Sequence, residues 1–195
     1  MKRISVAAAL VLVLGFSGAA YSQSTSERGW YIGGSLGEGE WKKWCDGVSA
    51  GCDKKDEVWR LFGGYKFSRL FSAELGYADL GKVTISGPLT SARAEATAWD
   101  VVGLLALPLG PVSIYGKLGA YYGDMEATSN VPAVGFTGSA SETNTDITYG
   151  AGVQFDFLRN FAVRGEWQRY EGFGGSGVGG ETDMDVYSVA LLWRF

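Results

Sequence analysis

Charged side chains with the spacing of one β-strand face are the residues of this sequence best suited to chemistry. They recur at alternating positions within short apolar segments, and alternate residues of a strand share one side of a sheet. Charged groups persist away from water only when they are paired and hydrogen-bonded, so five cations beside four anions predict a salt-bridged interior. The nine candidates are Arg60, Lys66, Glu74, Asp100, Lys117, Asp156, Arg164, Glu166 and Arg194.

Catalysis by these side chains has no support from the rest of the sequence. The chain contains no histidine, the residue that usually acts as general base or activates a nucleophile at neutral pH. The stretch 46–57 has the glycine and glutamate spacing of an EF-hand, but Val48 and Ala50 replace two oxygen ligands of calcium. We expect no enzyme, no catalytic residue, no cofactor and no metal site.

Residues 1–22 have the pattern of a secretory signal peptide. A basic start precedes an apolar run over 6–16 and then small residues, and this run is shorter than the roughly 20 residues of a membrane helix. We predict cleavage after Ser22, with cleavage after Ala20 as the alternative, and one domain over 23–195. Loss of the two basic residues takes the formal charge from −4 to −6, which argues against a nucleic-acid partner.

The two cysteines, Cys45 and Cys52, lie in a polar stretch. In an exported protein they predict a disulfide, which would stabilise the fold by about 2–3 kcal/mol on the chain-entropy model. A metal site is the competing interpretation. It fails because the chain offers neither histidine nor a third cysteine.

Eight segments of the chain alternate in polarity with the period of a strand. The connections between them alternate in length, short after every second segment and long near 38–57, 81–94, 124–145 and 172–183. These features predict an all-β fold, an eight-stranded antiparallel up-and-down barrel that crosses a bacterial outer membrane with short periplasmic turns and long extracellular loops. The predicted strands are 29–37, 58–67, 71–80, 95–107, 112–123, 146–157, 161–171 and 184–195.

One face of these segments is apolar and aromatic, and the other is small, polar or charged. We expect the apolar face to meet lipid and the other to line the lumen, because aromatic residues fall in two rows about 20 Å apart, as membrane interfaces require. The row near the long loops contains Trp59, Tyr77, Trp99, Tyr122, Tyr149, Trp167 and Tyr187. The row near the short turns contains Phe67, Phe71, Phe157, Phe161, Trp193 and Phe195.

The last segment combines two predicted roles. It should pair with the first segment and so remove both sheet edges. Its lipid-facing row ends on an aromatic residue, which resembles the signal that the barrel-assembly machinery reads. This row is Tyr187, Val189, Leu191, Trp193 and Phe195.

The sequence resembles the OmpA-type transmembrane domain over nearly all of residues 23–195. The resemblance implies a proposed ion-pair gate in the lumen, for which Glu74 and Arg164 match the family's inward Glu and Arg. Leu104 stands where the family often has an inward lysine, and the peptidoglycan-binding domain of larger members is not expected. The stretches that carry the resemblance are Gly29-Trp30-Tyr31-Ile32-Gly33-Gly34-Ser35-Leu36-Gly37, Phe62-Gly63-Gly64-Tyr65-Lys66-Phe67, Ala73-Glu74-Leu75-Gly76-Tyr77-Ala78-Asp79-Leu80-Gly81, Ile114-Tyr115-Gly116-Lys117-Leu118-Gly119, Tyr149-Gly150-Ala151-Gly152-Val153 and Arg164-Gly165-Glu166-Trp167-Gln168.

Two functions follow from this barrel. One is a structural and surface-interaction protein whose loops meet lipopolysaccharide, a host molecule or a phage. The other is a low-conductance, porin-like channel for small solutes. The acidic loop ends are either a solvated face or sites where divalent cations bridge to lipid head groups. Expected partners are outer-membrane lipid, periplasmic chaperones and the barrel-assembly machinery.

Overall fold

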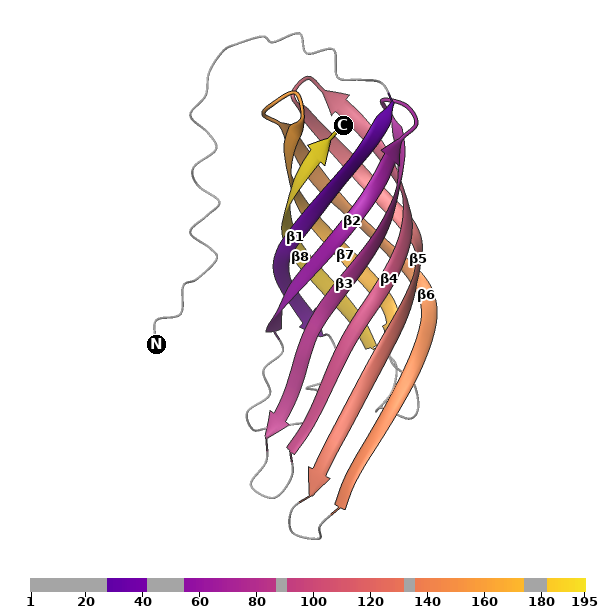
Figure 1. Cartoon of the computed structure of the whole chain (residues 1–195), viewed down its shortest axis with the longest axis vertical. Coiled ribbons are helices and arrows are strands. Elements are labelled where there is room, and N and C mark those ends of the chain that lie inside the picture. The colour runs from indigo at the N-terminus through magenta and orange to yellow at the C-terminus, as the bar shows by residue number, and fades with distance from the viewer. Residues whose placement is uncertain (1–27, 42–54, 87–90, 132–135, 174–181) are drawn as a thin grey trace, which may run out of the picture.

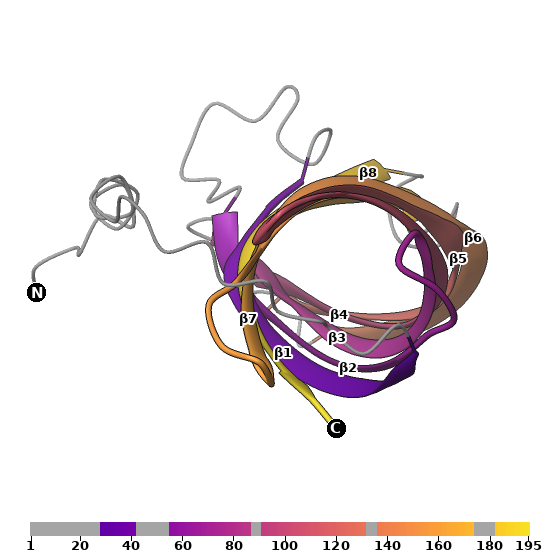
Figure 2. The same cartoon turned by 90° about the horizontal axis from the view of Figure 1, so that it is seen from above.

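The chain forms one closed antiparallel barrel in which every strand pairs with its neighbours in sequence (Figures 1 and 2). The computed structural model describes residues 28–41, 55–86, 91–131, 136–173 and 182–195. This architecture confirms the predicted eight-stranded barrel. The strands are β1 (Gly29–Trp41), β2 (Lys55–Lys66), β3 (Phe71–Ser86), β4 (Ser91–Leu109), β5 (Val112–Val131), β6 (Phe136–Asp156), β7 (Phe161–Phe173) and β8 (Thr182–Arg194).

The seam between β1 and β8 closes the barrel along nearly its whole height. Their register runs from Tyr31 opposite Arg194 to Trp41 opposite Met184. Beyond the last ladder pair, the amide of Phe195 donates to the carbonyl oxygen of Trp30 at 3.1 Å. The first and last strands therefore satisfy each other's backbone groups, and neither presents a free edge to lipid.

The described turns at one end of the barrel are short and use local hydrogen bonds. In the β2–β3 turn the hydroxyl of Ser68 accepts from the amides of Leu70 and Phe71. The β4–β5 turn contains Gly110 at φ 74°, in the left-handed region where a glycine costs least. The C-terminus lies at this same end (Figure 1).

At the opposite end the strands are longer than the sequence pattern predicts. The segments 81–94 and 124–145, expected as loops, are mostly ladder, because β3 continues to Ser86 and β5 pairs with β6 out to Val131 opposite Phe136. Beyond the lipid no apolar outer face is imposed on a strand, so periodicity does not reveal these continuations. We call these strand ends the distal arm, and they comprise residues 82–86, 91–95, 124–131 and 136–144 (Figure 1).

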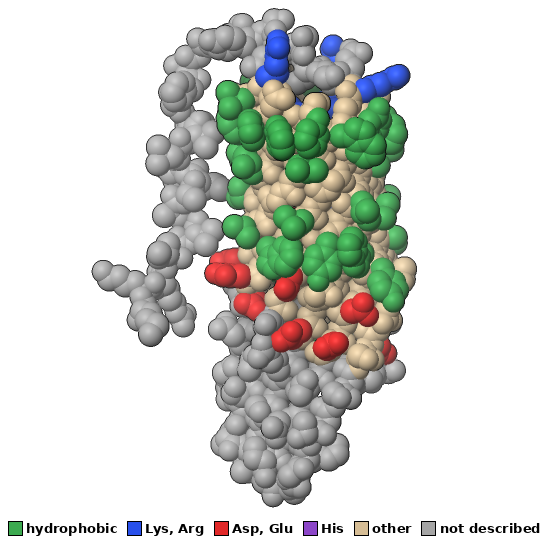
Figure 3. Space-filling model, in the orientation of Figure 1, with side chains coloured by type: hydrophobic (Ala, Val, Ile, Leu, Met, Phe, Trp, Pro, Cys, Tyr) green, Lys and Arg blue, Asp and Glu red, His purple; other side chains and the backbone are tan. Residues whose placement is uncertain are grey.

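Two belts of hydrophobic side chains cross the outer wall (Figure 3), and exposed apolar residues such as Leu75, Val101 and Leu118 lie between them. Trp99 and Tyr122 are about half exposed in the belt next to the distal arm. Phe71 and Trp193 are similarly exposed in the belt next to the short turns. Such a wall would be unstable in water but suits a bilayer with an interface at each belt. The predicted terminal row lies on this wall, with Tyr187, Val189, Leu191, Trp193 and Phe195 all exposed.

No helix within the described ranges is long and apolar enough to span a bilayer.

Gly119 offers a test of strand packing. A methyl group built on it would lie 2.7 Å from the Cα of Val102 and closer still to the carbonyl oxygen of Val101 on the neighbouring strand. We expect Gly119→Ala to lower the free energy of unfolding by about 1–3 kcal/mol, because the two strands must separate. Urea unfolding of the protein in vesicles, followed by tryptophan fluorescence, measures this change.

Gly165 provides the matched control. No atom lies within 4 Å of a methyl group built there, so Gly165→Ala should change the free energy of unfolding by less than about 0.5 kcal/mol. Equal losses in the two variants would contradict the packing that the structure gives to β4 and β5.

Candidate functional site

The structure places the nine charged residues predicted for the interior on the lumen side of the wall. Five of them, Arg60, Glu74, Asp100, Lys117 and Arg164, are buried, and the other four are partly buried. The nine residues come from seven different strands, β2 to β8. Side chains that are remote in sequence therefore meet only because the barrel closes.

Glu74 is the centre of the lumen network. Its Oε1 accepts a hydrogen bond from Nη1 of Arg164 at 2.6 Å, and its Oε2 lies 3.4 Å from Nη1 of Arg60. Arg60 in turn holds Asp100 through two donors, Nε at 2.8 Å and Nη2 at 2.5 Å. One chain of alternating charge thus crosses the lumen from β7 through β3 and β2 to β4.

A second branch of the network is built on Glu166. The ammonium of Lys117 donates to Oε1 of Glu166 and to the side-chain oxygen of Gln168, each at 2.5 Å. The hydroxyl of Tyr115 donates to Oε2 of Glu166 at 2.6 Å. This branch joins the first one through Arg164, whose Nη1 lies 3.9 Å from Glu166.

The second branch explains how the lumen accommodates Leu104 where the family often has an inward lysine. It is buried in the lumen against Val102 and Tyr115, and its register partner on the next strand is Lys117. The cation that the family resemblance places at position 104 is therefore supplied one strand away.

Tyrosines and glycines complete the fit. The hydroxyl of Tyr31 donates to Glu74 at 3.0 Å, and that of Tyr170 donates to Asp100 at 3.3 Å. Gly76 leaves room for the guanidinium of Arg60, since a methyl group at Gly76 would lie 2.5 Å from Nε. With these carboxylates engaged by cations and hydroxyls, the arrangement neutralises charge and fills space.

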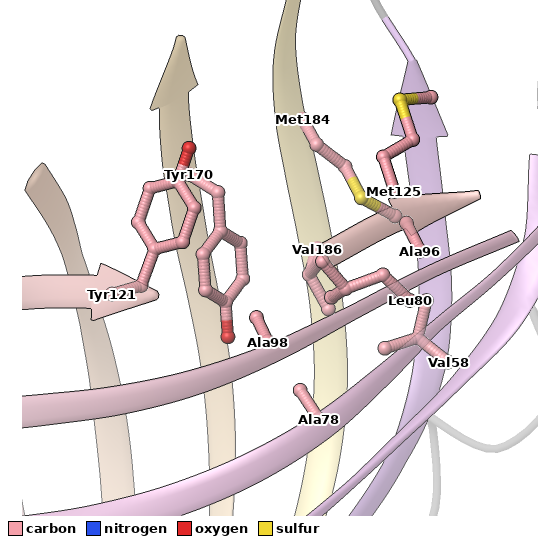
Figure 4. Packing of buried hydrophobic residues seen from close by; sticks show 10 residues of the cluster. All are labelled: Val58, Ala78, Leu80, Ala96, Ala98, Tyr121, Met125, Tyr170, Met184 and Val186. Carbon is pink, nitrogen blue, oxygen red and sulfur yellow. The ribbon is translucent and has the colours of Figure 1, made fainter. Parts of the chain in front are cut away.

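Figure 4 shows a layer of buried apolar side chains. It adjoins the network through Tyr170, which contacts Asp100, and its strand positions lie toward the distal arm. Sequence analysis expected small, polar or charged residues on the inward face, and here that expectation is wrong. Met125, Met184 and Leu80 are completely buried in this layer. The alternation of side chains along the strands explains why these residues point inward. It does not determine whether an inward side chain is polar or apolar. The layer consists of Val58, Ala78, Leu80, Ala96, Ala98, Tyr121, Met125, Tyr170, Met184 and Val186.

Three charged residues lie near the short-turn end of the lumen. Arg194 pairs with Asp156, and Lys66 is half-buried beside them. Sequence analysis missed a further pair on the outer face of β7 and β8, where Arg169 lies over the ring of Trp167 and holds the buried Asp185 through two donors at 2.6 and 2.8 Å. Only the β7–β8 register, which sets these residues opposite each other, would have revealed it.

Two predictions fall on residues that the structure does not describe. The disulfide between Cys45 and Cys52 and the signal peptide over 1–22 both lie outside the described ranges, and both stay predictions. Among the residues that are described, no three His, Cys, Asp or Glu side chains are grouped so as to hold a metal ion.

The network predicts a large cost for loss of Glu74. In Glu74→Gln the carboxylate shared by two guanidinium groups becomes neutral, and Arg164 keeps the neutral amide of Gln154 and, as its one carboxylate among the described residues, the more distant Glu166. We expect the free energy of unfolding to fall by about 3–5 kcal/mol, since an uncompensated charge stays buried. Urea titration in vesicles measures the change.

Asp124 serves as the control for that variant. It is exposed and accepts one hydrogen bond, from Thr143 at 2.7 Å, so Asp124→Asn should cost less than about 1 kcal/mol. A Glu74 variant as stable as the Asp124 variant would show that the lumen charges contribute little to stability.

Comparison with known proteins agrees with this geometry. Residues 8–195 match the family described as "Outer membrane protein beta-barrel domain". Outer membrane protein A of Serratia marcescens is 26% identical over 208 residues, covering 100% of this chain and 56% of that protein. The Klebsiella pneumoniae protein of the same name is 26% identical over 177 residues, covering 85% of this chain and 51% of that protein. The chain thus spans about half the length of the curated relatives it matches.

Solved barrels share the fold at lower identity. The crystal structure of Ail from Yersinia pestis superposes with a TM-score of 0.57 at 19% identity, covering 87% of this chain and 99% of Ail. Neisserial surface protein A superposes with a TM-score of 0.58 at 13% identity, covering 85% of this chain and 97% of that protein. With a lipid-facing wall, a filled lumen and a family match over residues 8–195, this chain belongs to the outer membrane protein β-barrel family and is an OmpA-like protein of the bacterial outer membrane.

Proposed function

We propose that the protein is a surface-interaction protein, in which the barrel is the anchor and the distal arm contacts a partner outside the cell. The observation that carries this proposal is the length of the paired strands in the arm. Tyr122 belongs to the belt next to the distal arm. Strand β5 continues nine residues beyond it, to Val131, and is paired with β6 throughout. At the rise of an antiparallel strand this is about 30 Å of ladder beyond the membrane interface.

The negative charge where the distal arm meets the membrane belt indicates which kind of partner surface could bind there. Exposed carboxylates gather just beyond the outer belt (Figure 3), among them Glu57, Glu95, Asp124 and Glu126. The Ail structure is a complex with the heparin analogue sucrose octasulfate, and an acidic rim would repel such a polyanion. We infer that this chain's partner presents a basic surface, or presents lipopolysaccharide phosphates through divalent cations.

The lumen supports an anchor rather than a conduit. The ion-pair network and the apolar layer are stacked along the axis, and eight strands leave a lumen that side chains can fill. A conducting path would need both layers to open. Opening the network would break buried ion pairs, and opening the apolar layer would expose its methionines to water. For purified protein in planar bilayers we therefore infer no reproducible ion steps, and regular steps would favour the channel alternative.

Trimming the arm tests the proposed function. Glu126 and Ser141 face each other across the β5–β6 ladder, so residues 127–140 can be replaced with a two-residue Asn-Gly turn. We expect bacteria displaying the trimmed protein to adhere to cultured epithelial cells no better than bacteria without the protein. Counts of adherent bacteria measure the effect.

Two controls accompany the trimmed variant. The barrel should still migrate as a folded, heat-modifiable band on unboiled gels, because its membrane-spanning pairs are unchanged. A full-length Asp124→Asn/Glu126→Gln variant should lose part of the adhesion, and the remaining adhesion should respond less to salt. Undiminished adhesion by a folded, trimmed barrel would refute a role for the arm.

We further propose that the row ending on Phe195 addresses the chain to the barrel-assembly machinery, after periplasmic chaperones have delivered it. The ring of Phe195 is 62% exposed on the outer wall and lies 4.6 Å from the ring of Trp193. Its backbone amide adds one hydrogen bond to the β1–β8 seam, the bond to Trp30, while its ring lies outside the ladder. This exposed, terminal position suits recognition before closure.

Deletion of Phe195 separates addressing from stability. We expect the folded band in cells to fall several-fold, while the same variant refolds normally into vesicles without any machinery. Pulse-labelled membranes on unboiled gels measure the cellular step. Phe157→Ala removes another exposed ring of the same belt and should insert at the normal rate, and equal defects in both variants would exclude a terminal signal.

A further inference from the structure

A small cavity opens at the short-turn end of the lumen, on the periplasmic side of the network. We call it the vestibule. All eight strands contribute to its wall, and it has about 40 Å³ of free volume, enough for about three waters or one small oxyanion. Tyr31, Tyr115 and Arg164 line its inner end, where their side chains contact Glu74 and Glu166 of the lumen network.

The wall of the vestibule is cationic. Lys66, Arg69, Arg164 and Arg194 line it together with the amide of Gln154 and the hydroxyls of Ser72 and Ser113, and no carboxylate lines it among the described residues. Two of these cations already hold a carboxylate: Arg194 pairs with Asp156, and Arg164 pairs through Nη1 with Glu74. The positive end of the molecule is visible in Figure 3.

Donors in this wall are left without acceptors. The side chain of Arg164 is 4% exposed, yet its Nε has no hydrogen-bond partner in the described part of the chain, and neither has the buried Nη1 of Arg194. Lys66 has no hydrogen-bond or ion-pair partner among the described side chains, and it is repelled by Arg194 and Arg69 while only Asp156 attracts it. Buried cationic donors that lack acceptors are costly.

The geometry points to the vestibule as a binding site for a small tetrahedral oxyanion of the phosphate class, taken from the periplasmic side. The two unsatisfied N–H groups on Arg164 and Arg194, together with the half-buried ammonium of Lys66, would become charge-assisted donors to its oxygens. The hydroxyls and the amide of Gln154 would complete the shell. Glu74 and Glu166, just beyond the inner end, would repel the anion and stop it from passing farther along the lumen.

Two sources of this chemistry are separable. One is free inorganic phosphate in the periplasm, and the other is the phosphodiester head group of an anionic lipid in the inner leaflet. The protein is labelled with nitrogen-15, purified in octyl glucoside, which contains no phosphate, and titrated first with inorganic phosphate and then with phosphatidylglycerol added to the micelles. The resonances of Arg164 Nε–H and of the Gln154 side-chain amide report binding.

We expect saturable shifts of both resonances with at least one of the two ligands, and the effective ligand identifies the source. Lys66→Gln should weaken binding about tenfold, the effect of losing one charge-assisted donor. Lys66→Arg, which keeps the charge, should retain binding. The matched control is Arg159→Gln, which removes a cation from an exposed turn at the same end but outside the vestibule, and its affinity should stay within about twofold of the parent.

Three results would overturn the site. The first is an absence of saturable shifts with either ligand. The second is an equal response to chloride at matched ionic strength, and the third is equal weakening by Lys66→Gln and Arg159→Gln, since each of these two shows general screening of a positive end. Heat-modifiable migration of each variant confirms that the barrel compared is folded.

Discussion

The backbone hydrogen bonds of the wall constrain everything else in this protein. Lipid supplies no partner for an amide or a carbonyl, so a sheet that crosses a membrane must close on itself. Here closure rests on the β1–β8 ladder and on the bond from Phe195 to Trp30. The strand number that this closure adopts then sets the width of the lumen, and eight strands make it just wide enough for side chains.

A lumen of this width must be filled, and the chain fills it in two ways. Toward the periplasm it uses ion pairs that tie distant strands together, with Glu74 on β3 held by Arg60 on β2 and Arg164 on β7. Toward the distal arm it uses packed apolar side chains such as Met125 and Met184. Inward glycines make the ion pairs possible, since Gly64 faces the ring of Tyr31 and Gly76 faces Arg60.

Sequence alone predicts the wall better than the interior. Alternation places all eight strands and sorts residues such as Trp99 and Asp100 to opposite faces, because lipid imposes an apolar outer face. It misses the distal arm, where no lipid imposes the pattern. It predicts that Arg60 and Glu166 point inward, but not that Arg60 holds Asp100 and Lys117 holds Glu166. Such pairings depend on the stagger of strands around the barrel, which no local pattern encodes.

The order of the two lumen layers has a physical consequence. The apolar layer lies between the ion pairs and the extracellular side, where it keeps water away from Arg60 and Asp100, and ion pairs are stronger where water is excluded. Tyr170 joins the two layers, because its ring packs on Tyr121 in the apolar layer while its hydroxyl donates to Asp100. The layers therefore support each other: the apolar side chains maintain the low dielectric that the charges need. The charges in turn fix the strands that hold those side chains in place.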